Sequence, residues 1–329
     1  MKKLIGIFLS SVYQLALRLS QGYYRAFPSR VRKVNARVIS IGNITWGGTG
    51  KTPLVAKLAH DLSGYGKRVA ILTRGYGGDE VAELKKKCPH VPILVGRDRV
   101  KTAREAVEKF NAEVVILDDG FQHLRLHRDL DVVTINATLP FGPGGLLPWG
   151  TMREPVEHLL RAQVFILTKS DIGSKNLPWI RQKLLSIRPD ALILEAVHKA
   201  LFYRDPFRER WYSMPETKGK KVATLSGIAD PFSFEKAVEN TGAEIVFAAR
   251  FDDHHRYTPK ELENFLRQSA DIGAQYVITT EKDFCRMGPL LKELAGKFPS
   301  DFHWFVLEIE FQVNDEEAFI RRCIDTPDS

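Results

Sequence analysis

Short apolar runs separated by helical stretches recur through the first half of the chain. Each run is four or five residues long and nearly continuous in hydrophobicity, which is typical of a strand buried on both faces. Because helical stretches lie between several of these strands, we predict a parallel sheet covered by helices on both faces. The runs are Val38–Ile41, Val69–Thr73, Val91–Val95, Val114–Leu117, Val132–Ile135 and Val164–Thr168.

A second set of elements follows a stretch in which this pattern is lost. Residues 198–221 mix proline with charge, and we interpret them as a connection between domains. Beyond them we expect strands at Val222–Leu225, Ile245–Ala248, Tyr276–Thr279 and Trp304–Ile309, and helices near Phe234–Asn240, Pro259–Ser269 and Asp315–Ile324. A chain of 329 residues with 44% hydrophobic content is long enough for two domains. We therefore predict an α/β fold with an amphipathic helix at residues 1–28, a main sheet domain at 29–200, and a linker with a smaller α/β domain at 201–329.

The amino-terminal helix has two different sides. Its uninterrupted apolar part, Leu4 to Leu17, is too short for a bilayer core, which needs about 20 residues. At helical spacing, one side carries Lys3, Ser10, Gln14, Arg18, Gln21 and Arg25, and the other carries Leu4, Phe8, Val12, Leu15, Leu19 and Tyr23. This pattern favours a helix that lies in a membrane interface.

The residues after this helix support the same interpretation. Pro28 ends the helix, and a basic cluster suited to anionic headgroups surrounds it, at Arg25, Arg30, Arg32, Lys33 and Arg37. Two alternatives stay open. Lys2 and Lys3 precede an apolar stretch, as in a cleaved signal peptide, although no small-x-small site follows. The helix could also pack on the core of its own domain.

Composition and charge do not distinguish among several classes of anionic ligand. The net charge of +8 and the pI near 9.3 attract anions of many kinds, including nucleic acid, anionic lipid and phosphorylated substrates. The three cysteines lie far apart without C-x-x-C spacing, so neither a disulfide framework nor a structural zinc site is indicated. This usage fits a reducing cytoplasm.

The strongest chemical signal follows the first strand. Residues 45–53 read T-W-G-G-T-G-K-T-P, and strand, glycine loop and Lys-Thr in this order are typical of a triphosphate site. Glycines let backbone N–H groups surround phosphate oxygens, Lys51 reaches the terminal phosphates, and the Thr52 hydroxyl can bind Mg²⁺. We expect ATP at the loop residues Thr45, Trp46, Gly47, Gly48, Thr49, Gly50, Lys51 and Thr52. The strict pattern has glycine where this chain has Thr45, so Gly42 and Asn43 must form the entering turn.

An acidic pair follows the strand Val114–Leu117. Asp118 or Asp119, at the carboxyl end of a strand beside the phosphate loop, could hold Mg²⁺ or its water. Adjacent side chains on an extended strand point in opposite directions, so we expect only one of them to face the metal. His123 and His127 are spaced for zinc, but a third ligand at sensible spacing is missing.

Two further patterns remain open. Thr168-Lys169-Ser170-Asp171 is similar to the guanine-reading T-K-x-D motif, which favours a rival function as a GTPase or a metallochaperone-type switch. Arg153-Glu154-Pro155 is, on its own, an ordinary helix start. Nucleic-acid binding is weakly supported, because the basic charge accompanies an apolar helix and not interleaved aromatics.

Motifs across nearly the whole chain resemble the tetraacyldisaccharide 4'-kinase (lipid A 4'-kinase) family. D-D-G-F-Q-H-x-x-L-x-R-D-L, starting at Asp118, is the most specific. The motifs occur in the family's order, as I-G-N-I-T-W-G-G-T-G-K-T-P (41–53), L-T-R-G-Y-G (72–77), G-D-E (78–80), G-R-D-R (96–99), L-D-D-G-F-Q-H-L-R-L-H-R-D-L (117–130), L-L-P-W-G-T-M-R-E-P (146–155), D-D-H-H-R-Y-T (252–258) and T-T-E-K-D (279–283).

The resemblance implies a P-loop kinase that transfers the ATP γ-phosphoryl group to the 4'-hydroxyl of a tetraacyl glucosamine disaccharide 1-phosphate. It also implies a peripheral, monotopic protein on the cytoplasmic face of the inner membrane, where an anionic surface is its partner, and no nucleic-acid partner. The basic charge and the amphipathic helix agree with this setting.

The resemblance also implies roles for individual residues. Asp79 matches the catalytic aspartate and His254 its supporting histidine, and a placed carboxylate can accept the proton of an attacking hydroxyl. The remaining matches are Lys51 in catalysis, Thr52, Asp118, Asp119 and Glu154 at Mg²⁺, and Arg74, Arg99 and Arg153 at substrate or phosphate.

The chain departs from the family in two places. Family members usually carry about two dozen more residues where Gly77 here adjoins Gly78, so the resemblance does not extend to the lid or lipid contact that this segment supplies in the family. The usual F-P-D-H-H reads F-D-D-H-H at residues 251–255, which adds a carboxylate beside the histidine.

Overall fold

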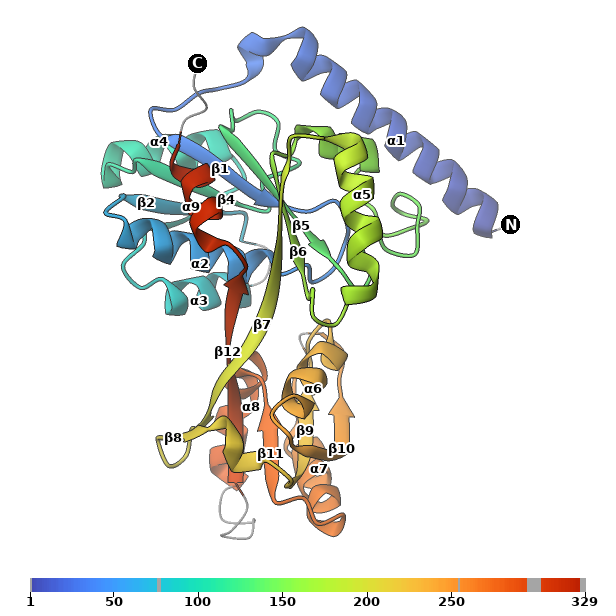
Figure 1. The fold of residues 1–329 in the computed structure, drawn as a ribbon, viewed down its shortest axis with the longest axis vertical. Helices are drawn as coiled ribbons and strands as arrows, with labels where there is room; N and C mark the ends of the chain where they lie inside the picture. The colour runs from blue at the N-terminus through green and yellow to red at the C-terminus, as the bar shows by residue number, and fades with distance from the viewer. Residues whose placement is uncertain (1, 76–77, 254, 295–302, 326–329) are drawn as a thin grey trace. The chain divides into compact units, whose positions relative to one another are not determined.

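A computed structural model describes residues 2–75, 78–253, 255–294 and 303–325, without the side chains of residues 2–5 and 78–80 (Figure 1). The chain divides into two compact units, which are described separately. The first comprises Met1–Val197 and Val313–Ser329, and the second comprises His198–Gln312. The carboxyl-terminal segment thus belongs to the first unit, whereas the sequence analysis assigned all of residues 201–329 to the second.

The first unit is built on a parallel sheet, as the apolar runs predict. Its strand order is β7-β6-β5-β1-β4-β2-β3, and every neighbouring pair in it is parallel. Every predicted strand here is confirmed, and β7 is an addition to the prediction. The strands are β1 (Arg37–Gly42), β2 (Val69–Thr73), β3 (Ile93–Val95), β4 (Val114–Asp118), β5 (Leu130–Asn136), β6 (Val164–Thr168) and β7 (Leu192–Asp205).

Helices cover both faces of this sheet (Figure 1). Right-handed crossovers place α2 (Lys51–Gly64) and α3 (Gly78–Lys87) on one face, because the strands they precede lie successively further toward β3. The chain then reverses direction, so α4 (Arg99–Phe110) and α5 (Leu177–Ile187) lie on the other face. There α4 packs on β2 and β3, and α5 packs on β5 and β6. Short 3-10 turns accompany them at η1 (Pro28–Arg30), η2 (Val156–Arg161) and η3 (Ser174–Asn176).

The returning helix α9 (Glu316–Ile324) is anchored to the start of the sheet. Arg37 donates from Nε to the Cys323 carbonyl at 2.6 Å and from Nη2 to the Asp325 carbonyl at 2.6 Å. Lys57 of α2 lies 2.8 Å from Glu316. Arg37, included in the basic headgroup cluster in the sequence analysis, therefore binds the backbone of the carboxyl-terminal segment.

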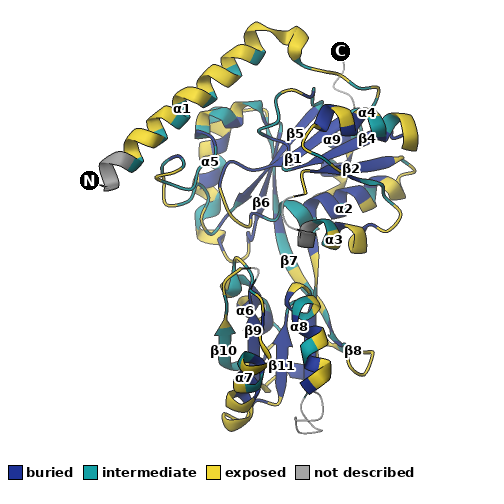
Figure 2. Cartoon of the chain, turned by 180° about the vertical axis from the view of Figure 1, so that it is seen from behind, coloured by how far each residue is buried: buried dark blue, intermediate teal, exposed yellow. Residues whose placement is uncertain are grey.

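Helix α1 (Lys2–Ala26) presents its apolar side to solvent (Figure 2). Phe8, Leu15 and Leu19 are 67%, 57% and 65% exposed. The partly buried positions form the opposite stripe, which includes Ser10 and Gln21. The helix therefore contacts its own unit, as in the second alternative, but through its polar stripe and not through its apolar side. No helix in the described part of the chain is long and apolar enough to cross a membrane.

The second unit is a smaller α/β unit. Its strand order is β10-β9-β11-β12-β7, with parallel pairs from β10 to β12 and with β8 antiparallel to β7. Residues 198–221, expected as a connection, contain the second part of β7, then β8 and η4. The elements are β8 (Arg210–Ser213), η4 (Met214–Thr217), β9 (Lys221–Ser226), α6 (Pro231–Glu239), β10 (Glu244–Arg250), α7 (Pro259–Asp271), β11 (Tyr276–Thr279), α8 (Glu281–Leu294) and β12 (His303–Val313).

Candidate active site

The glycine loop connects β1 to α2 and is held at both ends by buried polar side chains. Asn43, fully buried, donates from Nδ2 to Thr49 Oγ1 at 2.8 Å, and Thr49 Oγ1 lies 2.9 Å from Thr134 Oγ1. Gly50 caps α2 with a φ of 77°, which a glycine adopts without strain. The amides of the first helical turn therefore face the loop without competition from a side chain, which suits an anion.

The turn that enters the loop leaves no room for a side chain at Gly42. A Cβ at Gly42 would lie 2.6 Å from the Phe121 Cβ, so only glycine fits there. Thr45, which stands in place of the usual glycine, is buried and pairs with Met152 in a backbone bridge. Trp46, Gly47 and Gly48 are exposed in the loop itself.

Three charged side chains meet at the edge of this loop. Arg153 Nη1 donates to Asp119 Oδ1 at 2.7 Å, and Lys51 Nζ lies 3.8 Å from the same oxygen. Burial alone would raise the pKa of Asp119, but the hydrogen bond from Arg153 and the charges of Lys51 and Arg99 hold it below its ordinary value. Asp119 is thus an anion among cations, beside the place where the loop would hold phosphates.

The two adjacent aspartates differ in their exposure to solvent. Asp118 ends β4 and is buried, whereas the Asp119 side chain is 30% exposed and its backbone has a φ of 55°. Behind them Arg99 is almost completely buried and donates to the Asp118 carbonyl at 3.1 Å. Burial lowers the pKa of Arg99 against the opposing effect of both aspartates, but a guanidinium still stays charged at neutral pH.

Glu154 is surrounded by protein donors. This buried carboxylate accepts from Gln21, Gln122 and Arg161 at 2.9–3.1 Å and lies 2.7 Å from His158 Nδ1. Burial alone would raise the pKa of Glu154, but the hydrogen bond with His158 and the charge of Arg161 lower it. Protein donors therefore occupy both carboxylate oxygens of Glu154. This arrangement does not fit the role of metal ligand that the sequence analysis expected for Glu154.

The other expected metal ligands fit Mg²⁺ better. A Mg²⁺ ion at a nucleotide usually takes one or two protein oxygens and completes its shell with phosphate and water. The Thr52 hydroxyl and the carboxylates of Asp118 and Asp119 are hard oxygen ligands of this kind. Within the described residues, no group of three or more His, Cys, Asp or Glu is arranged to hold a metal ion. The zinc alternative at His123 and His127 is therefore unsupported there.

The side chains of the expected catalytic pair, Asp79 and His254, lie outside the part of the chain that the structure describes. Asp79 lies in the first turn of α3, where only the backbone is described, and His254 lies outside the described residues. Arg74, just after β2, is exposed and close enough to Arg99 to influence its pKa. The T-K-S-D segment begins beside the loop, because Thr168 donates to the Thr49 carbonyl at 3.2 Å.

In the second unit, two of the sequence motifs meet at one buried carboxylate. Asp283 of T-T-E-K-D is fully buried. It accepts from the Tyr257 hydroxyl at 2.8 Å, the Gly227 amide at 3.0 Å and the Thr280 hydroxyl at 2.7 Å. Tyr257 belongs to D-D-H-H-R-Y-T, so this contact anchors the segment that carries His254.

Comparison with known proteins identifies the family. The sequence profile of tetraacyldisaccharide-1-P 4'-kinase matches residues 3–80 and 77–326. The chain belongs to the tetraacyldisaccharide 4'-kinase family. The two matched segments meet at residues 77–80, where the sequence departs from the usual family spacing.

Individual members of the tetraacyldisaccharide 4'-kinase family are similar over most of their length. The enzyme of Anaeromyxobacter dehalogenans is 40% identical over 80% of this chain and 76% of its own length. That of Syntrophus aciditrophicus is 34% identical over 96% of this chain and 90% of its own. A crystal structure of LpxK from Aquifex aeolicus in complex with ATP is 26% identical, covers 98% of both chains and has a TM-score of 0.69.

Several contacts of this kinase site were not anticipated from the sequence. Tyr13 and Gln21 of α1 both reach the R-E-P segment, Tyr13 by donating to the Arg153 carbonyl at 2.9 Å. Gln122, a motif residue without an expected role, joins Glu154 to the Asn43 carbonyl at 2.9 Å. The one available signal was the polar side of α1, which the sequence analysis interpreted only as the side opposite to the membrane.

Proposed function

We propose that this chain transfers the γ-phosphoryl group of ATP to the 4'-hydroxyl of a tetraacyl glucosamine disaccharide 1-phosphate, a step in lipid A biosynthesis. The observation that carries the proposal is the cluster of Lys51, Asp119 and Arg153 at the glycine loop, in a chain of this kinase family. The family's printed name supplies the acceptor, and the Aquifex aeolicus complex supports ATP as the donor.

In the proposed reaction, the acceptor oxygen attacks the γ-phosphorus, and the bond from that phosphorus to the β,γ-bridging oxygen breaks, releasing ADP. The loop amides, Lys51 and Arg153 stabilise the negative charge that develops on the phosphoryl oxygens. Asp79 accepts the hydroxyl proton, and His254 orients that carboxylate. Mg²⁺, held through Thr52 and one of Asp118 and Asp119, would supply further charge neutralisation when bound.

We also propose that α1 holds the chain on the cytoplasmic face of the inner membrane. The outward apolar side of α1, with Phe8, Leu15 and Leu19 exposed, supports this placement. Lipid burial of such side chains contributes about 1.5–3 kcal/mol each. Basic residues at Arg25 and Arg30, both exposed, would face anionic headgroups. In this placement the chain meets a membrane-bound acceptor directly and needs no nucleic-acid partner.

The deciding experiment is a transfer assay. Purified protein with γ-labelled ATP and the tetraacyl disaccharide 1-phosphate should yield labelled lipid on thin-layer chromatography, and the label should be lost with Lys51→Ala. Release of inorganic phosphate alone, or a requirement for GTP, would instead favour the nucleotide-switch interpretation of Thr168–Asp171.

The membrane placement needs its own test. Phe8→Ser with Leu19→Ser should reduce cosedimentation with vesicles of phosphatidylglycerol and phosphatidylethanolamine by about tenfold or more. Ser20→Ala, at an exposed position on the same helix, is the matched control. Unchanged vesicle binding by the double variant would remove the membrane role of this face.

A further inference from the structure

We infer that α1 is also a working part of the nucleotide site, in which Tyr13 and Gln21 act as positioning residues for Arg153 and Glu154. The inference rests on the proposed function, because it takes Arg153 to act at the transferring phosphoryl group. The two sides of one helix then have separate tasks: the outward side meets the membrane and the inward side holds the catalytic segment in place.

The first link runs from Gln21 to the glycine loop. Gln21 Nε2 lies 3.1 Å from Glu154 Oε2 and 2.6 Å from His158 Nδ1. Gln122 Nε2 donates both to Glu154 Oε1 at 2.9 Å and to the Asn43 carbonyl at 2.9 Å. Asn43 in turn donates to Thr49 inside the loop. A continuous set of hydrogen bonds therefore joins the inward side of α1 to the residues that would surround phosphate.

The second link runs from Tyr13 to the acidic pair. The Tyr13 hydroxyl donates to the Arg153 carbonyl at 2.9 Å. Arg153 also donates from its amide to the Ile44 carbonyl at 2.7 Å and from its side chain to Asp119. The backbone and the side chain of one residue thus connect α1, the entrance of the loop and the Asp119 carboxylate.

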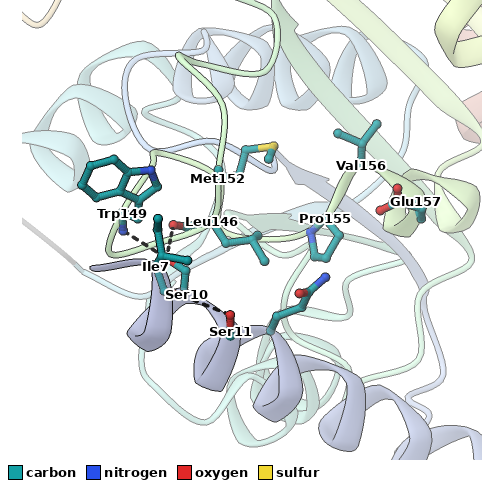
Figure 3. A pocket seen from close by; sticks show the side chains of 11 residues that line it. Ile7, Ser10, Ser11, Leu146, Trp149, Met152, Pro155, Val156 and Glu157 are labelled. Carbon is teal, nitrogen blue, oxygen red and sulfur yellow. Dashed lines mark hydrogen bonds between the residues drawn. The ribbon is translucent and has the colours of Figure 1, made fainter. Parts of the chain in front are cut away.

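The first half of α1 packs closely against the segment that contains Leu146 and Trp149. Ser10 Oγ donates to the Leu146 carbonyl at 2.8 Å and accepts from the Trp149 amide at 3.2 Å (Figure 3). A Cβ at Gly6 would lie 2.8 Å from the Trp149 ring. The contacts lie in the segment that directly precedes Arg153 and Glu154, so a shift of α1 would be transmitted to those two residues through the chain as well as through hydrogen bonds.

Loss of these contacts has a definite consequence for the site. Without Gln21, the buried Glu154 carboxylate loses one of its donors, and without the Tyr13 hydroxyl the Arg153 carbonyl loses its partner. Fewer donors on the buried Glu154 carboxylate and the lost partner of the Arg153 carbonyl weaken the local arrangement, so the R-E-P segment would sample other positions. Arg153 would then be less well placed at the phosphates, and nucleotide affinity and turnover would fall together.

The test compares the two sides of one helix in the full-length protein in detergent micelles. Tyr13→Phe with Gln21→Met removes the inward donors and keeps side-chain size, and Leu15→Ser with Leu19→Ser changes only the outward side. Mg-ATP affinity is measured by calorimetry, kcat and both KM values in mixed micelles, and membrane binding by cosedimentation with vesicles of phosphatidylglycerol and phosphatidylethanolamine.

We expect the inward pair to weaken Mg-ATP binding by about two- to tenfold and to lower kcat, with vesicle binding unchanged. The outward pair should weaken vesicle binding and leave Mg-ATP affinity unchanged. A cycle of Gln21→Met with Gln122→Met should show less than additive loss of ATP affinity, because both donors act through Glu154, whereas a general loss of stability would give additive effects.

Wild-type Mg-ATP affinity and kcat in a folded inward pair would overturn the inference, as would additive losses in the cycle. If the pair does not fold, Tyr13→Phe, which removes a single oxygen, gives the same comparison. Because calorimetry with Mg-ATP needs no lipid, a wild-type protein that binds ATP but does not phosphorylate the disaccharide would remove the proposed acceptor and leave this inference standing.

Discussion

The Arg153 guanidinium donates to the Asp119 carboxylate at 2.7 Å, although the two residues come from separate loops at the carboxyl edge of the sheet. Lys51 completes the group at 3.8 Å from the same oxygen. Two cations on one carboxylate leave a net positive charge beside the glycine loop, which attracts the polyanionic phosphates of a nucleoside triphosphate.

Lys51→Ala is expected to lower kcat by about 10²–10³-fold, because it removes a charge that offsets the transferring phosphoryl group. Labelled-lipid formation measures the effect, and circular dichroism checks the fold. Lys101→Ala, at an exposed position on α4, is the control. Near wild-type transfer by a folded Lys51→Ala protein would contradict the assignment of this loop as the nucleotide site.

Asp79→Ala is expected to lower kcat by about 10²–10⁴-fold with little change in ATP affinity, the usual effect of losing a general base. His254→Ala should cost less, and the double variant should resemble Asp79→Ala if the two act as one unit. Higher pH should partly restore the Asp79 variant. A rise in the KM for ATP alone would place Asp79 in the nucleotide or metal site and the base elsewhere.

Acid should destabilise the fold through His123. Burial, with the charges of Arg99 and Arg128, lowers the pKa of His123 from its ordinary 6.5 to about 4. Between these values the unfolded chain binds a proton that the folded chain does not. Stability present above about pH 6.5 is therefore lost as the pH falls toward 4, at up to about 1.4 kcal/mol per pH unit.

Unfolding midpoints measured from pH 7.5 to 4.5 check this expectation. His123→Gln should flatten the dependence, and His90→Gln, at an exposed position, should leave it as in the wild type. An equally steep loss in the His123 variant would assign the acid sensitivity to other groups.

Asp283→Ala is expected to destabilise the second unit by about 3–5 kcal/mol, because three donors, two of them buried, lose their shared acceptor and Arg286 loses an ion pair. Tyr257→Phe removes only one hydrogen bond and should cost about 1 kcal/mol. Thermal unfolding midpoints of the two variants measure this difference in stability. A small effect of Asp283→Ala would mean that the D-D-H-H segment is held by other contacts.

Most strands of the two units were predictable because each contains a short run of apolar residues. β8 was missed because its four residues are mostly exposed and lie in the stretch expected as a connection. β7 was missed because its residues alternate between buried and partly exposed and include His198 and Lys199. α8 was missed because it contains Gly288 and Pro289, which usually end a helix.

Only part of the candidate site could be predicted from the sequence. The glycine loop and Asp119 were predictable because each lies in a contiguous motif directly after a strand. The surroundings of Glu154 could not be predicted, because its donors Gln21, Gln122 and Arg161 are separated along the sequence and only folding brings them together. The family resemblance implied a metal ligand at Glu154, whereas its neighbours in the structure form a network of hydrogen bonds to both carboxylate oxygens.

The return of α9 to the first unit affects how the protein can be made. Arg37, at the start of β1, and Lys57 of α2 both bind residues within 316–325, which are synthesised after the whole second unit. During translation the kinase unit therefore stays incomplete while the second unit is already available to fold. A shortened gene that stops at Val197 would leave the Cys323 side of the first unit uncovered, so an expression version of this unit needs Val197 linked directly to Val313.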